Sequence, residues 1–201
     1  MSLRFVLASN NAKKLNELRA ILSSMGMEVI SQREAGCDFE VEETGTTFAE
    51  NSLLKARAAA EATGLPAIAD DSGLCVEALS GEPGVFSARY GGEQNKTDVD
   101  RYEFLLKNLE NTEQRDAKFV SCVTAVFPNG DVLSAEGECK GSILRVPVGE
   151  GGFGYDPVFR PAGFDRSMAE LSAEEKDAIS HRGNALRLFK TKLEEYLNKG
   201  R

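Results

Sequence analysis

The opening segment constrains the fold most, because a strand, a helix and a second strand follow one another within the first 31 residues. The apolar run LRFVLA at residues 3–8 predicts a buried strand. In NAKKLNELRAILSSMG, residues 11–26, leucines recur at helical spacing and Gly26 predicts the end of the helix. The sequence EVIS at residues 28–31 predicts the second strand. A strand–helix–strand unit favours an α/β fold.

Later segments predict a mixed sheet flanked by helices. Thr47 and Glu50 have capping-box spacing at the start of a helix that runs to Gly64. Residues 117–127 and 132–144 read as two antiparallel strands joined by the turn PNGD, and they suggest a separate lobe. The remaining predicted elements are a short strand at residues 66–70, a helix at 98–110, and helices after Ser172 and at 183–197.

Composition and charge exclude several classes of protein. Of the 201 residues 41% are hydrophobic, which indicates a globular chain with a substantial core. No apolar run approaches the roughly 18–20 residues of a membrane helix. We find no signal peptide, so we expect a cytoplasmic protein without a membrane partner. The formal charge of −8 argues against nucleic-acid binding, which requires many exposed Lys and Arg side chains. Four scattered cysteines predict reduced thiols.

The segment ASNNAKK, residues 8–14, lies where the first strand passes into the first helix. Helix N-termini carry unpaired N–H groups and a positive dipole end, which bind phosphate. Ser9, Asn10 and Asn11 add short polar groups, and Lys14 adds a positive charge. The alternative is an ordinary helix cap followed by a solvated lysine.

The segment EETGTTFAENSLLKA, residues 42–56, joins two acidic residues to the second helix. Asn51 and Lys55 lie four residues apart and therefore share a helix face. With Glu42 and Glu43 they supply the carboxylate, amide and ammonium groups that suit a metal–phosphate unit. The alternative is a capped helix with a solvated face.

The segment AIADDSGL, residues 67–74, places two adjacent aspartates at the end of a predicted buried strand. Mg2+ takes oxygen ligands, so Asp70 and Asp71 suit one ligand and one base. Successive strand residues point to opposite faces, so a shared role requires a turn, which Ser72 and Gly73 favour. The alternative is an Asx-type turn with solvated acids.

The segment GEGGFGYDPVF, residues 149–159, is rich in glycine, which permits close backbone approach. Phe153 and Tyr155 offer flat faces on which a base can stack, and Asp156 can accept hydrogen bonds or fix the loop. The alternative is a structural loop whose aromatic side chains pack inward.

Three cationic side chains gather near the C-terminus of this acidic chain. Lys176, His181 and Arg182 lie within seven residues. We expect them to face an anionic or polar substrate, and the alternative is a structural role. Together, the five segments predict an acidic metal site, phosphate-directed cations and a loop for a flat ring, as a nucleoside triphosphate site requires.

Six sequence blocks, in order, resemble the inosine triphosphate pyrophosphatase family. The blocks are LASNNAKKLNEL, EETGTTFAENSLLKA, PAIADDSGL, PGVFSARYGG, GGFGYDPVF and AISHRGNAL, and they extend from residue 7 to about residue 190. The resemblance implies a homodimeric α/β protein. It also implies one domain over residues 1–201, with an elongated mixed β-sheet flanked by helices and two lobes around a central substrate cleft.

The resemblance further implies the reaction and the residues that perform it. The reaction is Mg2+-dependent hydrolysis of ITP, dITP or XTP to the nucleoside monophosphate and pyrophosphate, which removes deaminated purines from the nucleotide pool. Asp71 matches the general base, and Glu43, Asp70 and Asp71 match the metal site. The implied substrate-binding residues are Ser9, Asn11, Lys14, Lys55, Ser72, Phe153, Gly154, Tyr155, Asp156, Lys176, His181 and Arg182.

Three rival functions stay open at this point. A related pyrophosphatase would act on a different nucleotide, and a nucleotide sensor would bind without turnover. The presence of Glu43, Asp70, Asp71 and Lys55 favours an enzyme, because a pure binder needs no base. A structural dimerisation module leaves the phosphate-directed residues unexplained.

Overall fold

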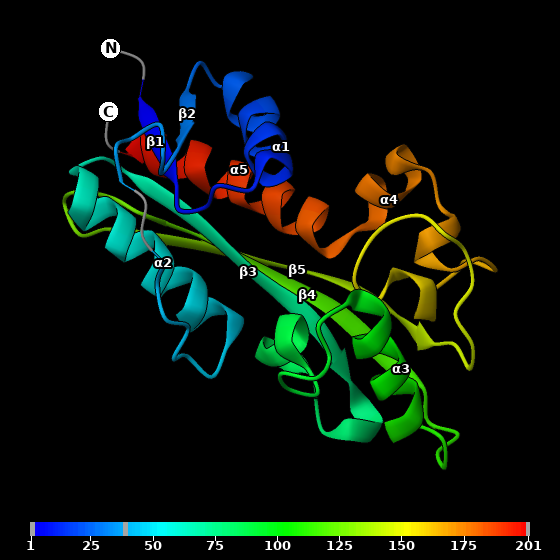
Figure 1. Ribbon diagram of the computed structural model, residues 1–201. Helices are drawn as coiled ribbons and strands as arrows, with labels where there is room; N and C mark the ends of the chain where they lie inside the picture. Colours follow the sequence, from blue (N-terminus) through cyan, green and yellow to red (C-terminus); the bar gives the residue numbers. More distant parts are fainter. Residues whose placement is uncertain (1–2, 38–39, 200–201) are drawn as a thin grey trace. The chain divides into compact units, whose positions relative to one another are not determined.

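Six strands form one mixed sheet in the computed structural model, which describes residues 3–37 and 40–199 (Figure 1). The strand order is β2-β1-β3-β4-β5-β6. The strands are β1 Arg4–Leu7, β2 Glu28–Ser31, β3 Ala67–Val76, β4 Asp116–Val126, β5 Val132–Ile143 and β6 Phe159–Pro161. The α-helices are α1 Ala12–Ser23, α2 Phe48–Thr63, α3 Asp98–Asn108, α4 Ala173–Ile179 and α5 His181–Lys199. Short 3-10 helices cover Glu77–Leu79, Gly84–Arg89, Asp156–Val158 and Met168–Glu170. The predicted α/β class and mixed sheet are confirmed.

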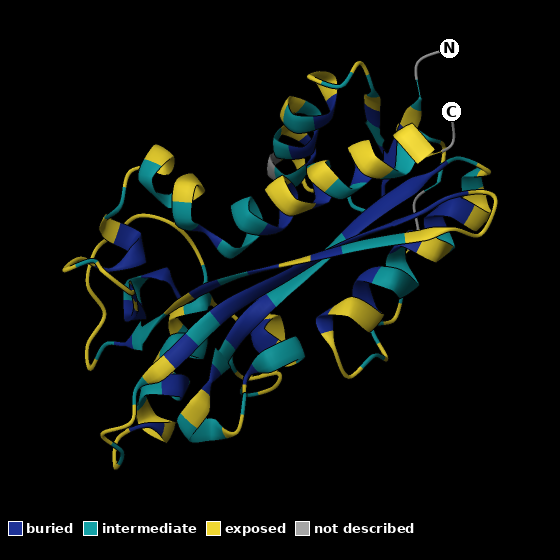
Figure 2. Cartoon of the chain, turned by 180° about the vertical axis from the view of Figure 1, so that it is seen from behind, coloured by how far each residue is buried: buried dark blue, intermediate teal, exposed yellow. Residues whose placement is uncertain are grey.

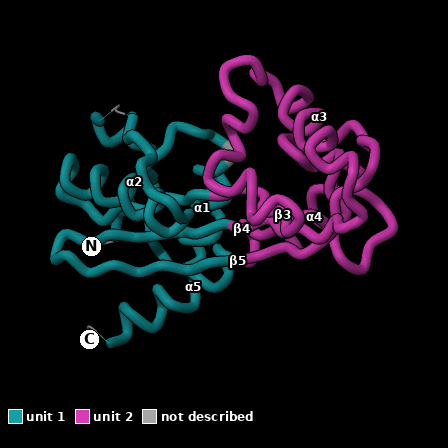
Figure 3. The backbone as a smooth tube through the Cα atoms, turned by 90° about the horizontal axis from the view of Figure 1, so that it is seen from below, with its two compact units in different colours: residues 1–71, 121–137, 185–201 teal, residues 72–120, 138–184 magenta. Residues whose placement is uncertain are grey.

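The chain divides into two compact units (Figure 3). Unit 1 comprises residues 1–71, 121–137 and 185–201, and unit 2 comprises residues 72–120 and 138–184. Strands β3, β4 and β5 and helix α5 contribute residues to both units. The single domain with two lobes around a cleft stays a prediction.

Unit 1 has two separate cores, one on each face of its part of the sheet. Strand β1 pairs in parallel with β2 and with β3, which places Leu7 beside Ser31 and Ile68. Phe5, Leu7 and Ile68 pack with the leucines of α1 and the apolar stripe of α5. Val6, Ala67 and Ala69 belong to the second core, with the alanines of α2. Consecutive strand residues therefore face different helices, as the pleat requires. In the burial view the strands are dark over much of their length, with teal and yellow stretches between (Figure 2).

Strand β3 is longer than the sequence predicts. The sequence predicts a strand that ends at residue 70, followed by a turn at residues 72–73. This prediction is wrong, because β3 runs without interruption to Val76. Both aspartates within it have lysine partners, at 2.9 Å for Asp70 and 3.0 Å for Asp71. Paired carboxylates can be buried at lower cost than unpaired ones, so the two acids do not terminate the strand.

A capping box begins helix α2 and a glycine ends it, as the sequence predicts. Thr47 Oγ1 accepts a hydrogen bond from Glu50 N at 3.1 Å, and Glu50 Oε2 accepts one from Thr47 N at 3.1 Å. Gly64 ends the helix with a φ of 67°, a left-handed conformation that favours glycine. The predicted capping box and stop are confirmed.

Unit 2 has its core on one face of its part of the sheet. Leu74, Phe119, Cys139 and Phe159 are buried there, together with residues of α3. Strand β6 extends the edge and pairs with β5 in antiparallel register, with Ile143 opposite Phe159.

Within the described residues, no helix is long and apolar enough to cross a membrane.

We predict that Thr47→Ala lowers the free energy of unfolding by about 1 kcal/mol, because it removes the capping oxygen of α2. Thr47→Ser keeps that oxygen and should keep most of the stability. Urea unfolding of the two variants and the unsubstituted protein measures the difference. Equal losses for serine and alanine would contradict a capping role.

Candidate functional site

A lysine held between two carboxylates forms the centre of the polar cluster in unit 1. Lys55 Nζ lies 2.8 Å from Glu43 Oε1 and 3.0 Å from Asp71 Oδ1. The side chain of Lys55 is 17% exposed, that of Glu43 26% and that of Asp71 12%, so solvent screens their charges only in part. The structure therefore brings together Glu43, Lys55 and Asp71, which come from three separate segments.

For both Asp71 and Lys55, burial and the charge of the oppositely charged partner shift the pKa in opposite directions. Burial raises the pKa of Asp71, and the neighbouring Glu43 raises it further, whereas Lys55 and Asn51 lower it. The net result is a pKa above the ordinary value of an aspartate. Burial lowers the pKa of Lys55, but Asp71 and Glu43 outweigh it and hold that pKa above its ordinary value. Lys55 is thus a permanent cation beside a carboxylate that protonates more readily than usual.

Asn51 connects the segment that carries Glu43 to Asp71. Its side chain is fully buried. Asn51 Nδ2 donates to Asp71 Oδ2 at 3.3 Å, and Asn51 Oδ1 accepts from Gly45 N at 2.8 Å. A Cβ at position 45 would lie 2.6 Å from Asn51 Oδ1, so only glycine fits there without displacing the amide. Sequence reasoning placed Asn51 beside Lys55 as a group suited to a metal–phosphate unit, but did not predict its contact with Asp71.

Buried hydroxyl groups fix helix α2 on the sheet beside this cluster. Ser52 Oγ lies 2.8 Å from Thr124 Oγ1, which lies 2.7 Å from Ser134 Oγ. Ser52 and Thr124 are fully buried. Because buried polar groups need partners, this chain of hydroxyls specifies one placement of α2 on β4 and β5, and with it the placement of Asn51 and Lys55.

Lys14 and Asp70 form a separate ion pair on the other face of β3. Lys14 Nζ lies 2.9 Å from Asp70 Oδ1. Adjacent strand residues point to opposite faces, so Asp70 meets helix α1 whereas Asp71 meets helix α2. The structure brings Glu43 and Asp71 together but places Asp70 with Lys14 instead. The described residues hold no group of three or more His, Cys, Asp or Glu side chains that could bind a metal ion.

The start of helix α1 is capped by its own residues. Asn11 Oδ1 accepts from Lys14 N at 3.1 Å, and Ser9 Oγ accepts from Asn11 N at 3.1 Å. The side chains predicted to contact phosphate therefore also perform the capping role that was the alternative. Phosphate contact by the same residues stays a prediction, and a capped N-terminus keeps the positive dipole end that such contact requires.

The glycine–aromatic loop of unit 2 forms a second cluster. Asp156 Oδ2 accepts from Phe153 N at 2.8 Å and is also bound by Lys176 Nζ. That ammonium lies 4.5 Å from the centre of the Phe153 ring. A Cβ at position 152 would come within 2.1 Å of Asp156 Oδ2, so this turn requires Gly152, whose φ is +77°.

The two aromatic residues of the loop face different surroundings. Phe153 is 51% exposed, as a stacking surface must be. Tyr155 is buried in the core of unit 2, and its hydroxyl donates to Ser87 O at 2.8 Å. Burial raises the pKa of Tyr155 well above its ordinary value. The loop therefore offers one ring face from Phe153, and Tyr155 anchors it.

The remaining predicted residues lie elsewhere in unit 2. The His181 ring stacks on Phe119 of β4, with ring centres 4.9 Å apart. Arg182 follows it in α5 and is half-buried, and Ser72 follows Asp71 in β3. Sequence reasoning missed Asp98, whose Oδ2 accepts from Gly154 N at 2.7 Å. No local pattern links these two residues, which lie 56 positions apart.

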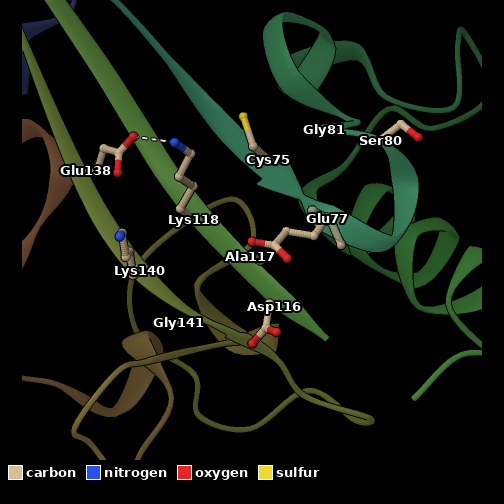
Figure 4. A pocket seen from close by; sticks show the side chains of 11 residues that line it. Cys75, Glu77, Ser80, Gly81, Asp116, Ala117, Lys118, Glu138, Lys140 and Gly141 are labelled. Atoms are coloured by element: carbon tan, nitrogen blue, oxygen red, sulfur yellow. Dashed lines mark hydrogen bonds and ion pairs between the residues drawn. The ribbon is translucent and has the colours of Figure 1, made fainter. Parts of the chain in front are cut away.

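Unit 2 also contains a pocket of about 610 Å³, with a Lys118–Glu138 ion pair at its wall (Figure 4). Its lining includes Cys75, which alternates along β3 with the core residues on either side. The residues that line this pocket are different from the predicted site residues.

Comparison with known proteins identifies the class. The profile of the Ham1 family matches residues 5–192. The dITP/XTP pyrophosphatase of Streptomyces coelicolor is 48% identical over 198 residues, which cover 96% of this chain and 98% of that protein. The dITP/XTP pyrophosphatase of Escherichia coli O157:H7 is 49% identical over 191 residues, covering 92% and 95%. The structure of a HAM1 protein from Coxiella burnetii superposes with a TM-score of 0.91 at 45% identity, covering 96% and 99%.

The fold and these matches define a hydrolase of the pyrophosphatase class. The chain belongs to the Ham1 family. The family resemblance seen in the sequence is thereby confirmed.

We predict that Lys55→Met makes stability more sensitive to pH. The pKa of Asp71 is already raised, and removal of Lys55 takes away the cation that lowers it. A carboxyl group with a raised folded-state pKa contributes stability that is present below its unfolded pKa and lost as the pH rises through the folded one. The free energy of unfolding should therefore fall more between about pH 4 and 7 in the variant.

The double variant Lys55→Met/Asp71→Asn is the matched control, because it removes the titrating carboxyl group together with its lysine. Urea unfolding at several pH values measures both variants. The same pH dependence in the single and the double variant would refute the assigned coupling.

Proposed function

We propose that this enzyme hydrolyses non-standard purine nucleoside triphosphates, such as ITP, dITP and XTP, to the nucleoside monophosphate and pyrophosphate. The observation that carries the proposal is the Glu43–Lys55–Asp71 cluster, in a chain matched over nearly its full length by dITP/XTP pyrophosphatases. The proposed role is removal of deaminated purines from the nucleotide pool. The homodimeric state and the cytoplasmic location stay predictions.

The donor set of the cluster fits Mg2+. Glu43 and Asp71 direct carboxylate oxygens at one ammonium, within 3.0 Å, so two hard donors converge on a cationic centre. Mg2+ is commonly held by one or two carboxylates together with substrate phosphates and water. When bound, the ion would neutralise charge on the phosphate oxygens. Asp70 as a further ligand stays a prediction, because its partner in the structure is Lys14.

Asp71 is the proposed general base. A water molecule attacks one phosphorus of the anhydride between the α and β phosphates, and the bond from that phosphorus to the bridging oxygen breaks. The other phosphate group leaves with the bridging oxygen, and a proton of the water passes to the Asp71 carboxylate. Burial moves the pKa of Asp71 upward, the direction that improves a carboxylate as a base near neutral pH. Lys55 and Lys14 would stabilise negative charge on the phosphates, and Ser9, Asn11 and the start of α1 would contact them.

Unit 2 supplies the groups proposed to recognise the base. The exposed ring of Phe153 is suited to stacking, and Lys176 beside it adds a cation. Hypoxanthine and xanthine carry a 6-keto oxygen where adenine carries an amine. A donor such as Arg182 would donate a hydrogen bond to the keto oxygen and disfavour the amine, and such a mismatch in a buried site changes kcat/KM by several orders of magnitude.

A substrate panel tests the reaction and its specificity together. ITP, dITP, XTP, GTP and ATP are compared with Mg2+ present, and pyrophosphate and orthophosphate are detected separately. We expect pyrophosphate from ITP, dITP and XTP, with GTP and ATP slower by about 10²-fold. Orthophosphate release, or no turnover of any substrate, would refute the proposed reaction.

We predict that Asp71→Asn lowers kcat by at least about 10²-fold, the usual contribution of a general base. The amide preserves the shape of the side chain, so the thermal midpoint should change little. Asp70→Asn is the matched comparison on the opposite face of the same strand. A kcat near the normal value in Asp71→Asn would remove Asp71 from its role.

A further inference from the structure

The loop that carries Phe153 is held by its neighbours while its aromatic ring stays exposed. Asp156 accepts from Phe153 N, and Asp156 N donates to Phe153 O at 3.2 Å. These two bonds close the turn internally. Gly154, inside the turn, has a φ of +61° and depends on a group outside the loop for its N–H.

That group is Asp98, the first residue of helix α3. Asp98 Oδ2 accepts from Gly154 N at 2.7 Å, a charge-assisted bond at the short end of the normal range. Asp98 Oδ1 lies 2.5 Å from Arg101 Nη2. Burial raises the pKa of Asp98, but the Gly154 N–H and Arg101 outweigh it and hold that pKa below its ordinary value. The carboxylate that faces the loop is therefore ionised near neutral pH.

Asp98 is not needed to cap its own helix. Thr97 Oγ1 accepts from Asp100 N at 3.1 Å, and Asp100 Oδ2 accepts from Thr97 N at 2.8 Å, which completes a capping box. Acidic residues in the first turn of a helix usually serve the helix itself. Here Asp100 performs that task, so the Asp98 carboxylate is directed at the loop.

Arg101 is itself fixed by the segment that precedes the helix. Its Nη1 donates to Asn95 O at 3.3 Å and to Lys96 O at 3.2 Å. The Arg101 side chain is only 16% exposed, whereas that of Asp98 is 45% exposed. A continuous chain of contacts thus leads from the start of α3 through Arg101 and Asp98 to the peptide between Phe153 and Gly154.

We propose that Asp98 is a positioning residue for recognition of the purine base. By binding Gly154 N, it holds the Phe153 ring in one orientation before substrate arrives, and it does not touch the substrate. This inference rests on the proposed function, in which Phe153 stacks on the base. A loop ordered in advance avoids the entropy cost of ordering on binding.

The test compares three variants. Asp98→Ala removes the acceptor of Gly154 N, and Asp98→Asn retains an acceptor oxygen at the same position. Asp100→Ala is the matched control, because it removes an aspartate from the same helix turn but spares the loop. For each variant we measure hydrogen–deuterium exchange of residues 150–157 and the KM and kcat for ITP. We also measure inhibition by tripolyphosphate, which has no purine base.

We expect faster exchange of the loop and a KM for ITP about tenfold higher in Asp98→Ala, the size of a lost charge-assisted hydrogen bond. Its kcat and its inhibition by tripolyphosphate should stay near the unsubstituted values. Asp98→Asn should restore most of the exchange protection and of the affinity for ITP. Asp100→Ala should lower only the thermal midpoint.

Several results would overturn the proposal. Unchanged exchange in Asp98→Ala would show that Asp98 does not hold the loop. Faster exchange with an unchanged KM would show that loop order does not serve the base. A parallel loss of ITP and tripolyphosphate affinity would indicate general damage. Inactivity of the unsubstituted enzyme would instead refute the proposed function, and ITP binding by calorimetry would then decide the role of Asp98.

Discussion

Two adjacent aspartates in an unbroken strand organise the polar chemistry of unit 1. Because the pleat sends Asp70 and Asp71 to opposite faces of β3, each needs its own cation. Lys14 of α1 provides one and Lys55 of α2 provides the other. Loss of either lysine would leave a largely buried carboxylate without its cation, which is strongly unfavourable. The ion pairs therefore constrain the positions of α1 and α2 on the sheet. The apolar cores fill the space between these helices and the strands.

Carboxylates serve a different purpose in unit 2. In unit 1 the aspartates pair with ammonium groups. In unit 2 Asp98 and Asp156 also have cationic partners, but in addition each accepts a hydrogen bond from the backbone of the aromatic loop. Charge that binds the backbone orders a segment that would otherwise be mobile, since glycine-rich turns lose the most entropy on folding. Tyr155 adds an anchor in the core. The backbone of the loop is consequently held in place where it carries Phe153, although the loop contains little regular secondary structure.

Local patterns in the sequence predicted most elements correctly, and non-local contacts account for what was missed. The Thr47–Glu50 capping box and the Gly64 stop depend on neighbours within one turn, so the sequence alone identifies them. The continuation of β3 depends on lysines 16 and 56 positions away, and a strand propensity cannot include them. The contact between Asp98 and Gly154 likewise joins distant segments. The sequence left open whether Asp70 and Asp71 alternate across a strand or meet at a turn, and the fold shows that they lie on opposite faces of β3. The roles of the site residues stay predictions.

Continuity of β3 favours the proposed role of Asp71 as a general base, because a strand end would fix that side chain less firmly. An aspartate in a turn samples several orientations, and catalysis would have to fix one of them at each turnover. Asp71 instead lies in a hydrogen-bonded strand, with Lys55 on one carboxylate oxygen and Asn51 on the other. Asn51 and Lys55 are in turn fixed by a helix that buried hydroxyls hold to the sheet. Such preorganisation is what makes charged groups effective in catalysis, because their orientation is settled during folding rather than during the reaction.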